Sequence, residues 1–176
     1  MKNLVKGIVS AALVGSMLMS VAGCVRFSVI DYDDFVDALE EEAGLDEDDC
    51  RTGKDKKKYG YEMKRYIEGG KGTHTVFDFY EFEDEDDAVA YFEDEYDDYL
   101  DALEDDDNFD GSHKENFDED SATGYIIVDA EYDSKSIYGG IFLKENTFIQ
   151  VITTSTKDKD KDRVDSVLSA IGYPKP

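Results

Sequence analysis

A short acidic segment contains the spacing of oxygen donors that a calcium site uses. Asp106, Asn108 and Asp110 alternate along the chain, and Gly111 follows them. Calcium prefers hard oxygen ligands at such alternating positions, with a glycine that allows the sharp turn of the loop. Position 12 of the loop is normally a glutamate, and here it is Phe117. Calcium binding at this segment is therefore a hypothesis, and the missing donor favours the alternative of an acidic surface loop; no other cofactor is expected.

Other residues that carry out catalysis in proteins are few and separate. The histidines are His74 and His113, and the thiols are Cys24 and Cys50. None lies in a local catalytic or metal-binding motif, and carboxylate pairs are too common in this chain to identify one of them. A Cys50–His74 pair formed by folding is the alternative that would make the chain a hydrolase. The sequence predicts a protein that is not an enzyme.

The N-terminal region has the parts of an export signal. Lys2 and Lys6 precede an apolar stretch at residues 8–21, which is too short for a comfortable membrane span. The stretch ends in Val21-Ala22-Gly23-Cys24, an aliphatic residue and two small residues before a cysteine. This segment resembles the lipobox of bacterial lipoproteins, and the resemblance covers residues 1–24 alone.

The resemblance implies a lipid anchor. Residues 1–23 would be the signal peptide, Cys24 would carry acyl chains such as palmitate, and residues 24–30 would hold the lipidated cysteine and a short tether. Two acyl chains give stable anchoring without a spanning helix. The mature protein is then expected at the cell membrane, lipid-anchored on the extracytoplasmic side. Val25 stands where some lipoproteins have a retaining aspartate, which predicts the outer membrane if the host has two membranes.

The charge of the mature chain limits its partners. Removal of residues 1–23 takes away two lysines and no acidic residue, which leaves 17 basic and 44 acidic residues and a formal net charge of −27. Nucleic acid binding needs clustered lysine and arginine, so we exclude it. Anionic lipid headgroups would also be repelled, which leaves the lipid on Cys24 as the expected membrane contact. Cations and basic peptides would be attracted.

Residues 31–176 are expected to fold as a single acidic domain. Apolar residues make up 40% of the chain and include 12 tyrosines and 10 phenylalanines, too much apolar surface to leave in water. A chain of this length buries one core of ordinary size. Once Cys24 is lipidated only Cys50 remains, so this core must be stable without an internal disulfide.

Three segments have the periodicity of amphipathic helices. Residues 31–44 have apolar side chains at helical spacing, acidic residues in the first turn and a glycine at the end. Residues 84–103 have one apolar stripe opposite a face of aspartate and glutamate. Residues 157–171 repeat valine, leucine and isoleucine at i, i+3, i+4 and i+7 before Gly172 and Pro174. The sequence therefore predicts three helices.

Strands are expected between these helices. Residues 73–82 alternate and are rich in β-branched and aromatic residues. Most of residues 45–72 is predicted as loop, with one short strand at 59–67. Three later strands are joined by links so short that they must be antiparallel. These later strands are residues 124–132, 136–144 and 147–154. We thus expect an α+β domain, with an antiparallel sheet of four or five strands and three helices packed mainly on one face.

The combined observations favour a membrane-anchored extracytoplasmic lipoprotein whose domain binds a cationic or peptide ligand without catalysis. Two alternatives stay open: a structural or accessory envelope lipoprotein with no small ligand, and a hydrolase with a site assembled from separate residues. A pocket with converging polar groups would favour binding or catalysis. A packed sheet with a flat acidic surface would favour the accessory role.

Overall fold

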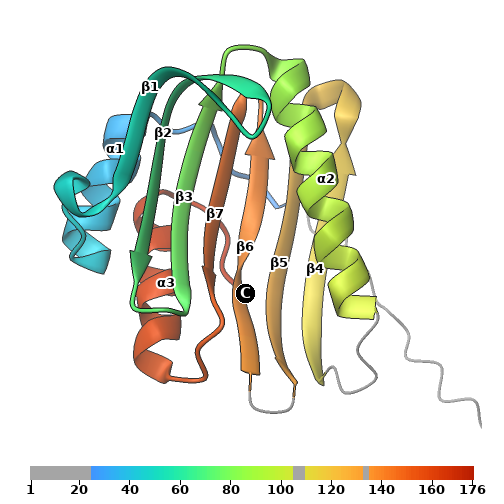
Figure 1. Ribbon diagram of the computed structural model, residues 1–176. Coiled ribbons are helices and arrows are strands. Elements are labelled where there is room, and N and C mark those ends of the chain that lie inside the picture. Colours follow the sequence, from blue (N-terminus) through green and yellow to red (C-terminus); the bar gives the residue numbers. More distant parts are fainter. Residues whose placement is uncertain (1–24, 105–109, 133–134) are drawn as a thin grey trace, which may run out of the picture.

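A computed structural model describes residues 25–104, 110–132 and 135–176 of the chain. Within these residues the centre of the fold is one sheet of seven strands, in the spatial order β1-β2-β3-β7-β6-β5-β4 (Figure 1). Every neighbouring pair is antiparallel. The strands are β1 (Arg51–Lys58), β2 (Tyr61–Lys71), β3 (Thr75–Phe82), β4 (Asp110–Asp118), β5 (Thr123–Tyr132), β6 (Lys135–Lys144) and β7 (Thr147–Thr153).

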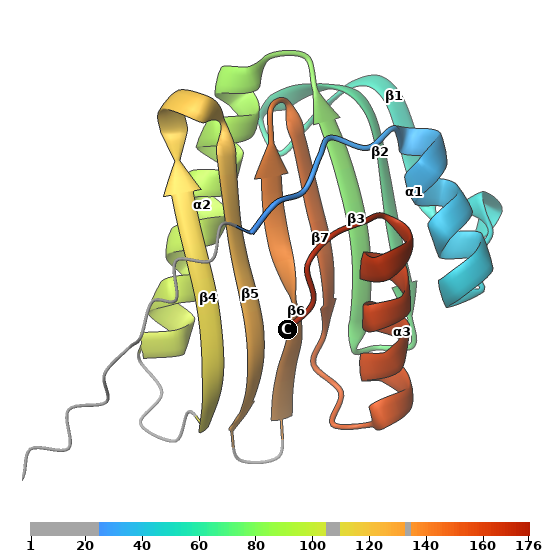
Figure 2. The same cartoon turned by 180° about the vertical axis from the view of Figure 1, so that it is seen from behind.

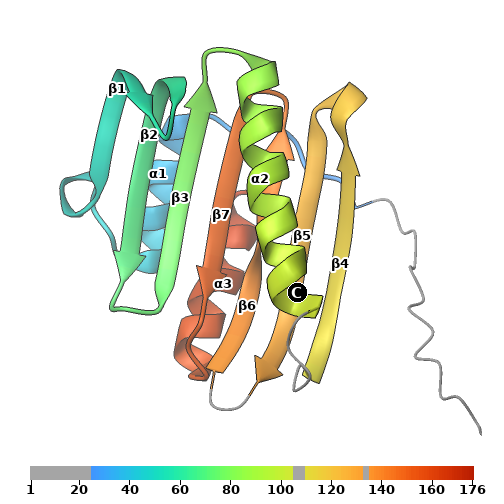
Figure 3. The ribbon, with the colours of Figure 1, turned by 45° about the vertical axis from the view of Figure 1, so that its right-hand side comes forward.

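The helices lie on both faces of this sheet. Two of the α-helices cover one face, which Figure 2 shows from the front, and α2 crosses the opposite face, as Figure 3 shows. Each face has its own apolar core. The helical segments are α1 (Tyr32–Ala38), which continues into the π-helical turn η1 (Leu39–Ala43), the 3-10 turns η2 (Glu47–Asp49) and η3 (Glu119–Ser121), α2 (Glu85–Glu104) and α3 (Asp158–Ala170).

The helix predictions are confirmed by the elements and by how they end. In α3 the buried residues Val164, Val167 and Leu168 are the ones that the helical spacing selected. Gly44 ends the first helical segment with a φ of 62°, and Gly172 follows α3 with a φ of 72°. Both glycines adopt the left-handed conformation that residues with a side chain rarely take, so they stop the helices where the sequence indicated.

The α+β class is confirmed, but the expectation of four or five strands is wrong. The sheet has two more strands, β1 and β4, and both lie at its edges. Nearly every residue of these strands is exposed or half-buried, so neither strand carries the alternation of apolar and polar residues that reveals a strand in a sequence. The short strand expected at residues 59–67 is part of the longer β2.

The expected placement of the helices also needs correction. The apolar stripe of α2 packs on the face opposite α1 and α3, so the helices do not share one face. The tether at residues 25–30 is a second difference, because it is not a free spacer. Val25, Phe27 and Ile30 pack against the same core as α1 and α3. The chain is therefore held to the domain from its first described residue.

Candidate functional site

The predicted calcium site is only partly within the described structure. Asp106 and Asn108 lie outside the described residues, and Asp110 is the exposed first residue of β4. Phe117, where the loop would need its last donor, packs against Phe92 of α2 with ring centroids 5.2 Å apart. Across the described ranges, no group of three or more histidine, cysteine or carboxylate side chains is arranged to hold a metal ion. Calcium binding stays a prediction from the sequence.

Cys50 and His74 have separate neighbours. A Cβ placed on Gly69 would lie 3.0 Å from Cys50 Sγ, which shows how closely the thiol packs on β2. Burial and neighbouring carboxylates raise the pKa of the Cys50 thiol, the opposite of what a nucleophilic cysteine needs. His74 lies in the turn before β3, where its Nδ1 is 3.4 Å from Thr154 Oγ1. The contacts of these side chains give no support to a Cys50–His74 pair.

A lysine ammonium surrounded by tyrosine rings lies on the α2 face of the sheet. Lys58 Nζ is 4.0 Å from the ring centroid of Tyr66, 5.0 Å from that of Tyr59 and 5.7 Å from that of Tyr80. Glu68 forms an ion pair with it. The ammonium nitrogen is fully buried. We call these five residues the lysine cage.

The β1–β2 hairpin brings Lys58 to this position. The turn residues Tyr59 and Gly60 both have positive φ, at 51° and 95°, which is the two-residue turn that matches the twist of paired strands. The turn bends toward α2, so that the rings of Tyr59 and Tyr61 each lie 5.9 Å from that of Tyr91. Gly53 leaves room for the cage on β1, because a Cβ there would lie 2.3 Å from the Tyr66 ring.

Glu68 is the centre of the polar contacts in the cage. Tyr80 and Tyr59 both donate hydrogen bonds to Glu68 Oε1, at 2.7 and 2.9 Å. Lys58 pairs with the other oxygen, Oε2, which also lies 3.5 Å from Arg51 Nη1 at the exposed edge. Burial alone would raise the pKa of Glu68, but the interactions with Lys58 and the two tyrosines outweigh it and the pKa is lowered. Glu68 is thus the anion of the cage at neutral pH.

Asp78 is a second carboxyl group beside the cage. It lies directly opposite Glu68 in the β2–β3 register, so the two side chains share one face of the sheet. Tyr80 donates a hydrogen bond to it at 3.3 Å. Burial, and then the charge of Glu68, raise the pKa of Asp78 to about 7. Asp78 is therefore a neutral acid below this pH and a buried anion above it.

Helix α2 places further polar groups near Asp78. The charge of Glu95 also raises the pKa of Asp78, and burial raises the pKa of Glu95 itself. On β7, Gln150 lies opposite Asp78 in the register and donates a hydrogen bond to Tyr99 Oη at 2.7 Å. Among the described residues, neither Asp78 nor Glu95 forms an ion pair. The cage and its surroundings therefore hold three carboxyl groups around one buried ammonium.

A second charged cluster lies on the other face of the same strands. A bulge in β2 turns Lys64 and Arg65 toward Glu81, with Arg65 Nε 2.8 Å and Lys64 Nζ 3.7 Å from its carboxylate oxygens. Arg65 also lies over the ring of Tyr32, with 5.1 Å between Cζ and the ring centroid. A recess of about 730 Å³ adjoins this cluster. Its lining has four basic and four acidic side chains, so it selects no sign of charge.

Comparisons with known proteins find no match for this chain, neither a family model nor a curated protein nor a solved structure. Its site must therefore be interpreted from its own chemistry. Cys24, the predicted lipidation site, lies outside the described residues. Of the helices that are described, none is both long enough and apolar enough to cross a membrane.

Sequence reasoning missed the lysine cage. Its members come from three strands and from the turn between β1 and β2, and two of the contacts cross from β1 to residues on β2 and β3 that are up to 22 positions away. One local signal was present, because Tyr59-Gly60 is a turn sequence between a lysine-rich segment and a segment with two tyrosines. The run of lysines before it concealed β1, and without β1 there was no hairpin to predict.

Proposed function

We propose that this chain is an extracytoplasmic lipoprotein, anchored through Cys24, whose lysine cage binds an ammonium ligand. The lipobox-like segment supports the anchor, and the formal net charge supports attraction of cations. The lysine cage is the place that we propose for the cationic partner predicted from the sequence. The ligand class is a primary amine, as in a polyamine or in a lysine side chain of a peptide.

The observation that carries this proposal is the environment of Lys58 Nζ. Tyrosine faces attract a cation through the ring quadrupole, and each such contact contributes about 2 kcal/mol when the cation is desolvated. Three rings and the Glu68 carboxylate do this for Lys58. An amine of the same size from outside would find the same contacts. Lys58 then acts as an internal competitor that occupies the cage until a ligand displaces it.

The position of Lys58 makes such an exchange feasible. It is the last residue of an edge strand and directly precedes the Tyr59-Gly60 turn. Its strand pairs with β2 alone, so outward movement of this end breaks no contact in the centre of the sheet. Tyr59 is 57% exposed, which places one wall of the cage at the surface.

The excess of carboxyl groups favours a ligand with more than one positive charge. Lys58 neutralises Glu68, whereas Asp78 and Glu95 have no cation of their own among the described residues. A diamine that places one ammonium in the cage and another beside Asp78 would satisfy both. Its second charge would also favour the ionised form of Asp78, so binding would release a proton near neutral pH.

Hydrolysis is the second candidate, because the cage shows one feature of an acid–base pair. The pKa of Glu68 is lowered and that of Asp78 is raised to about 7, and enzymes often use two carboxyl groups whose pKa values are pushed apart. The contacts of Glu68 argue against this role. Both of its oxygens already bind Lys58, Tyr59 or Tyr80, so neither is free to attack a substrate.

Calorimetry with spermidine tests the proposed function. The full chain should bind spermidine, and Lys58→Met should bind it more tightly, because the internal competitor is gone. Lys56→Met removes an exposed lysine of the same strand and is the matched control. The affinity of Lys56→Met for spermidine should equal that of the unchanged chain or rise far less than that of Lys58→Met.

Two outcomes would contradict the proposal. Equal affinities for both variants would mean that spermidine binds the acidic surface without using the cage. No binding by the unchanged chain or by Lys58→Met, with both shown to be folded by circular dichroism, would favour the accessory role without a small ligand.

A further inference from the structure

The sheet face opposite α2 is covered by the tether where no helix reaches it. Residues 25–30 run across β5 and β6 toward the start of α1 (Figure 2). The ring of Phe27 lies 4.9 Å from Tyr173, 5.5 Å from Phe142 and 6.3 Å from Tyr125. These contacts fix the tether at a defined place on the domain. Residue 24, the predicted lipidation site, directly precedes the tether in the sequence.

Basic side chains gather around this place. Lys144 follows Phe142 by two positions on β6, so it has the same orientation in the sheet, and it donates a hydrogen bond to Thr123 at 2.8 Å. Lys114 on β4 is opposite Ile127 of β5, on this same face. Arg26 is exposed on the tether itself. Among the described residues, none of these three basic side chains forms an ion pair.

No ion pair neutralises the three basic residues. Asp118 is in register with Thr123 at the end of β4, and among the described residues it forms no ion pair with any of them. Asp129 and Glu131 lie further along β5 and are paired with Lys161, at 3.9 and 3.2 Å. Three basic side chains without an ion pair are unusual in a chain whose formal net charge is −25.

A recess adjoins the same residues. It measures about 630 Å³ and is lined by Val25, Arg26, Phe27, Ser28, Thr123, Lys144, Ile171 and Gly172. Its apolar lining comes mainly from the tether and from Ile171, and its two basic groups are Arg26 and Lys144. This combination of an apolar floor and two cations fits the headgroup region of an anionic phospholipid. We call the recess, the tether and Lys114 together the anchoring face.

We propose that the anchoring face docks on anionic phospholipid headgroups of the membrane that holds the lipid anchor. This inference rests on the proposed anchor at Cys24, which would place two acyl chains one residue before the recess. Basic residues near an anionic membrane surface each strengthen binding about fivefold, equivalent to about 1 kcal/mol. Docking would give the domain one orientation, with α2 and the lysine cage directed away from the bilayer.

This proposal differs from an expectation drawn from composition. The net charge of the chain predicted that headgroups would repel the domain and that the lipid alone would hold it. Charge acts locally, however, because salt screens it over about 8 Å at physiological ionic strength. The acidic residues elsewhere on the domain therefore do not prevent contact through the anchoring face.

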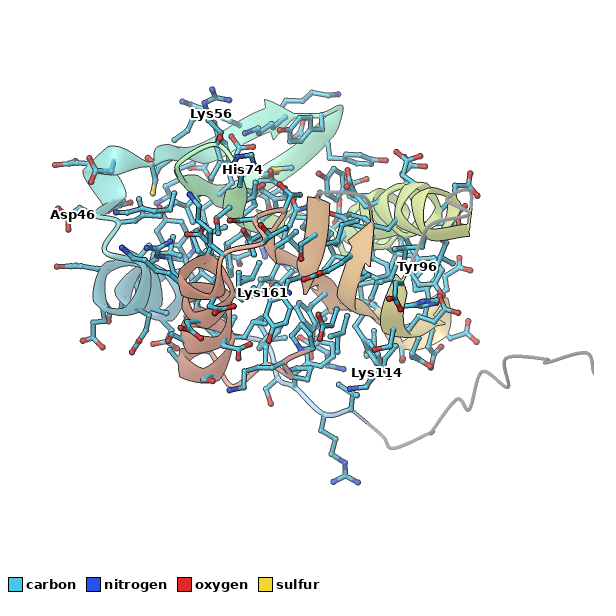
Figure 4. All side chains as sticks on the ribbon, turned by 90° about the horizontal axis from the view of Figure 1, so that it is seen from below. Asp46, Lys56, His74, Tyr96, Lys114 and Lys161 are labelled. Carbon is cyan, nitrogen blue, oxygen red and sulfur yellow. The ribbon has the colours of Figure 1, made fainter. Side chains whose placement is uncertain are left out.

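Amine labelling of the lipidated full chain tests the docking. The protein is reconstituted in vesicles of phosphatidylcholine, with or without phosphatidylglycerol, and treated with a membrane-impermeant amine reagent. Mass spectrometry then compares Lys114 with Lys56, two exposed lysines of opposite edge strands that Figure 4 shows on opposite sides of the domain. We expect the labelling rate of Lys114 to fall severalfold when phosphatidylglycerol is present, and that of Lys56 to stay constant.

The variant Arg26→Gln/Lys144→Gln provides the control, since it keeps Lys114 as the reporter. Its Lys114 should be labelled on anionic vesicles nearly as fast as on neutral ones. Equal labelling of Lys114 on both vesicle types in the unchanged, lipidated chain would overturn the docking proposal. A chain that incorporates no labelled fatty acid would instead overturn the proposed anchor, so the two failures are distinguishable.

Discussion

On the α2 face of the sheet, the lysine cage holds one ammonium beside Glu68, with the carboxyl groups of Asp78 and Glu95 close by, whereas on the opposite face the tether lies beside three basic side chains that form no ion pair among the described residues. The same acidic chain thus builds two different charged environments. The cage is assembled by strand pairing and helix packing, and the anchoring face by a tether that packs on the sheet. Net charge predicts neither environment, because each depends on which few residues the fold brings together.

Removal of the cage anion should have the largest effect. Glu68→Gln leaves the Lys58 ammonium buried without its charged partner, and loss of one member of a buried ion pair costs about 3 kcal/mol or more. We expect chemical denaturation to show this loss of unfolding free energy. Glu62→Gln changes an exposed glutamate of the same strand and should change stability little. Equal effects of the two variants would mean that the cage is not an energetic unit.

Loosening of the tether should have the next largest effect. Phe27→Ala removes three ring contacts from a half-buried position, which we expect to cost about 2 kcal/mol of unfolding free energy, below the range for fully buried phenylalanines. Val29→Ala is the control, because Val29 is 38% exposed in the same tether. A tether that is a free spacer would make both variants neutral in thermal unfolding.

Titration of Asp78 should have a smaller effect that depends on pH. The pKa of Asp78 is raised to about 7 in the folded protein. Between about pH 4 and 7 the folded state therefore keeps a proton that the unfolded state has already released. Its contribution to stability is present in acid and lost as the pH rises through about 7. Asp78→Asn should therefore raise the free energy of unfolding at pH 8 and leave it unchanged at pH 4.

The control for this titration is Asp97→Asn, which changes an exposed aspartate of α2. It should show no comparable step between these pH values. If Asp78→Asn raised the free energy of unfolding equally at both pH values, burial and the charge of Glu68 would not be raising the pKa of Asp78.

Calcium should have the smallest effect of those tested. The spacing at Asp106, Asn108 and Asp110 predicts that calcium raises the melting temperature more than magnesium does, because magnesium demands stricter octahedral geometry. Asp110→Ala should remove the difference between the two ions. Equal stabilisation by both ions, unchanged in the variant, would indicate screening of the acidic surface without a site.

The sequence predicted the parts of the fold that bury an apolar stripe. The helix α3 and the strand β3 lie where periodicity placed them, since Val164, Val167 and Phe79 must face a core. The edge strands β1 and β4 were not predictable in this way, because most of their side chains are exposed and leave no alternation to detect. The periodicity of α2 did not show that it packs on the face opposite α1 and α3, because an amphipathic helix fits either face of a sheet.

The candidate site was beyond prediction for a related reason. The sequence indicated a cationic partner from composition, but the cage depends on the register that sets Glu68 opposite Asp78 and on the turn that carries Lys58 over Tyr66. Register is fixed by long-range pairing, which local patterns do not encode. The tether differs in that its apolar residues, Val25, Phe27 and Ile30, alternate with polar or exposed ones and gave a local hint of packing.

Chemical rescue of the emptied cage tests the central claim most directly. Lys58→Ala removes the internal ammonium and leaves the rings of Tyr59, Tyr66 and Tyr80 around Glu68. Our account predicts that n-propylamine, which reproduces the part of the side chain lost beyond Cβ, restores the melting temperature of this variant in a saturable manner, whereas the neutral n-propanol does not. If neither compound restores it, or both do so equally, the cage does not recognise an ammonium from outside and the proposed function is wrong.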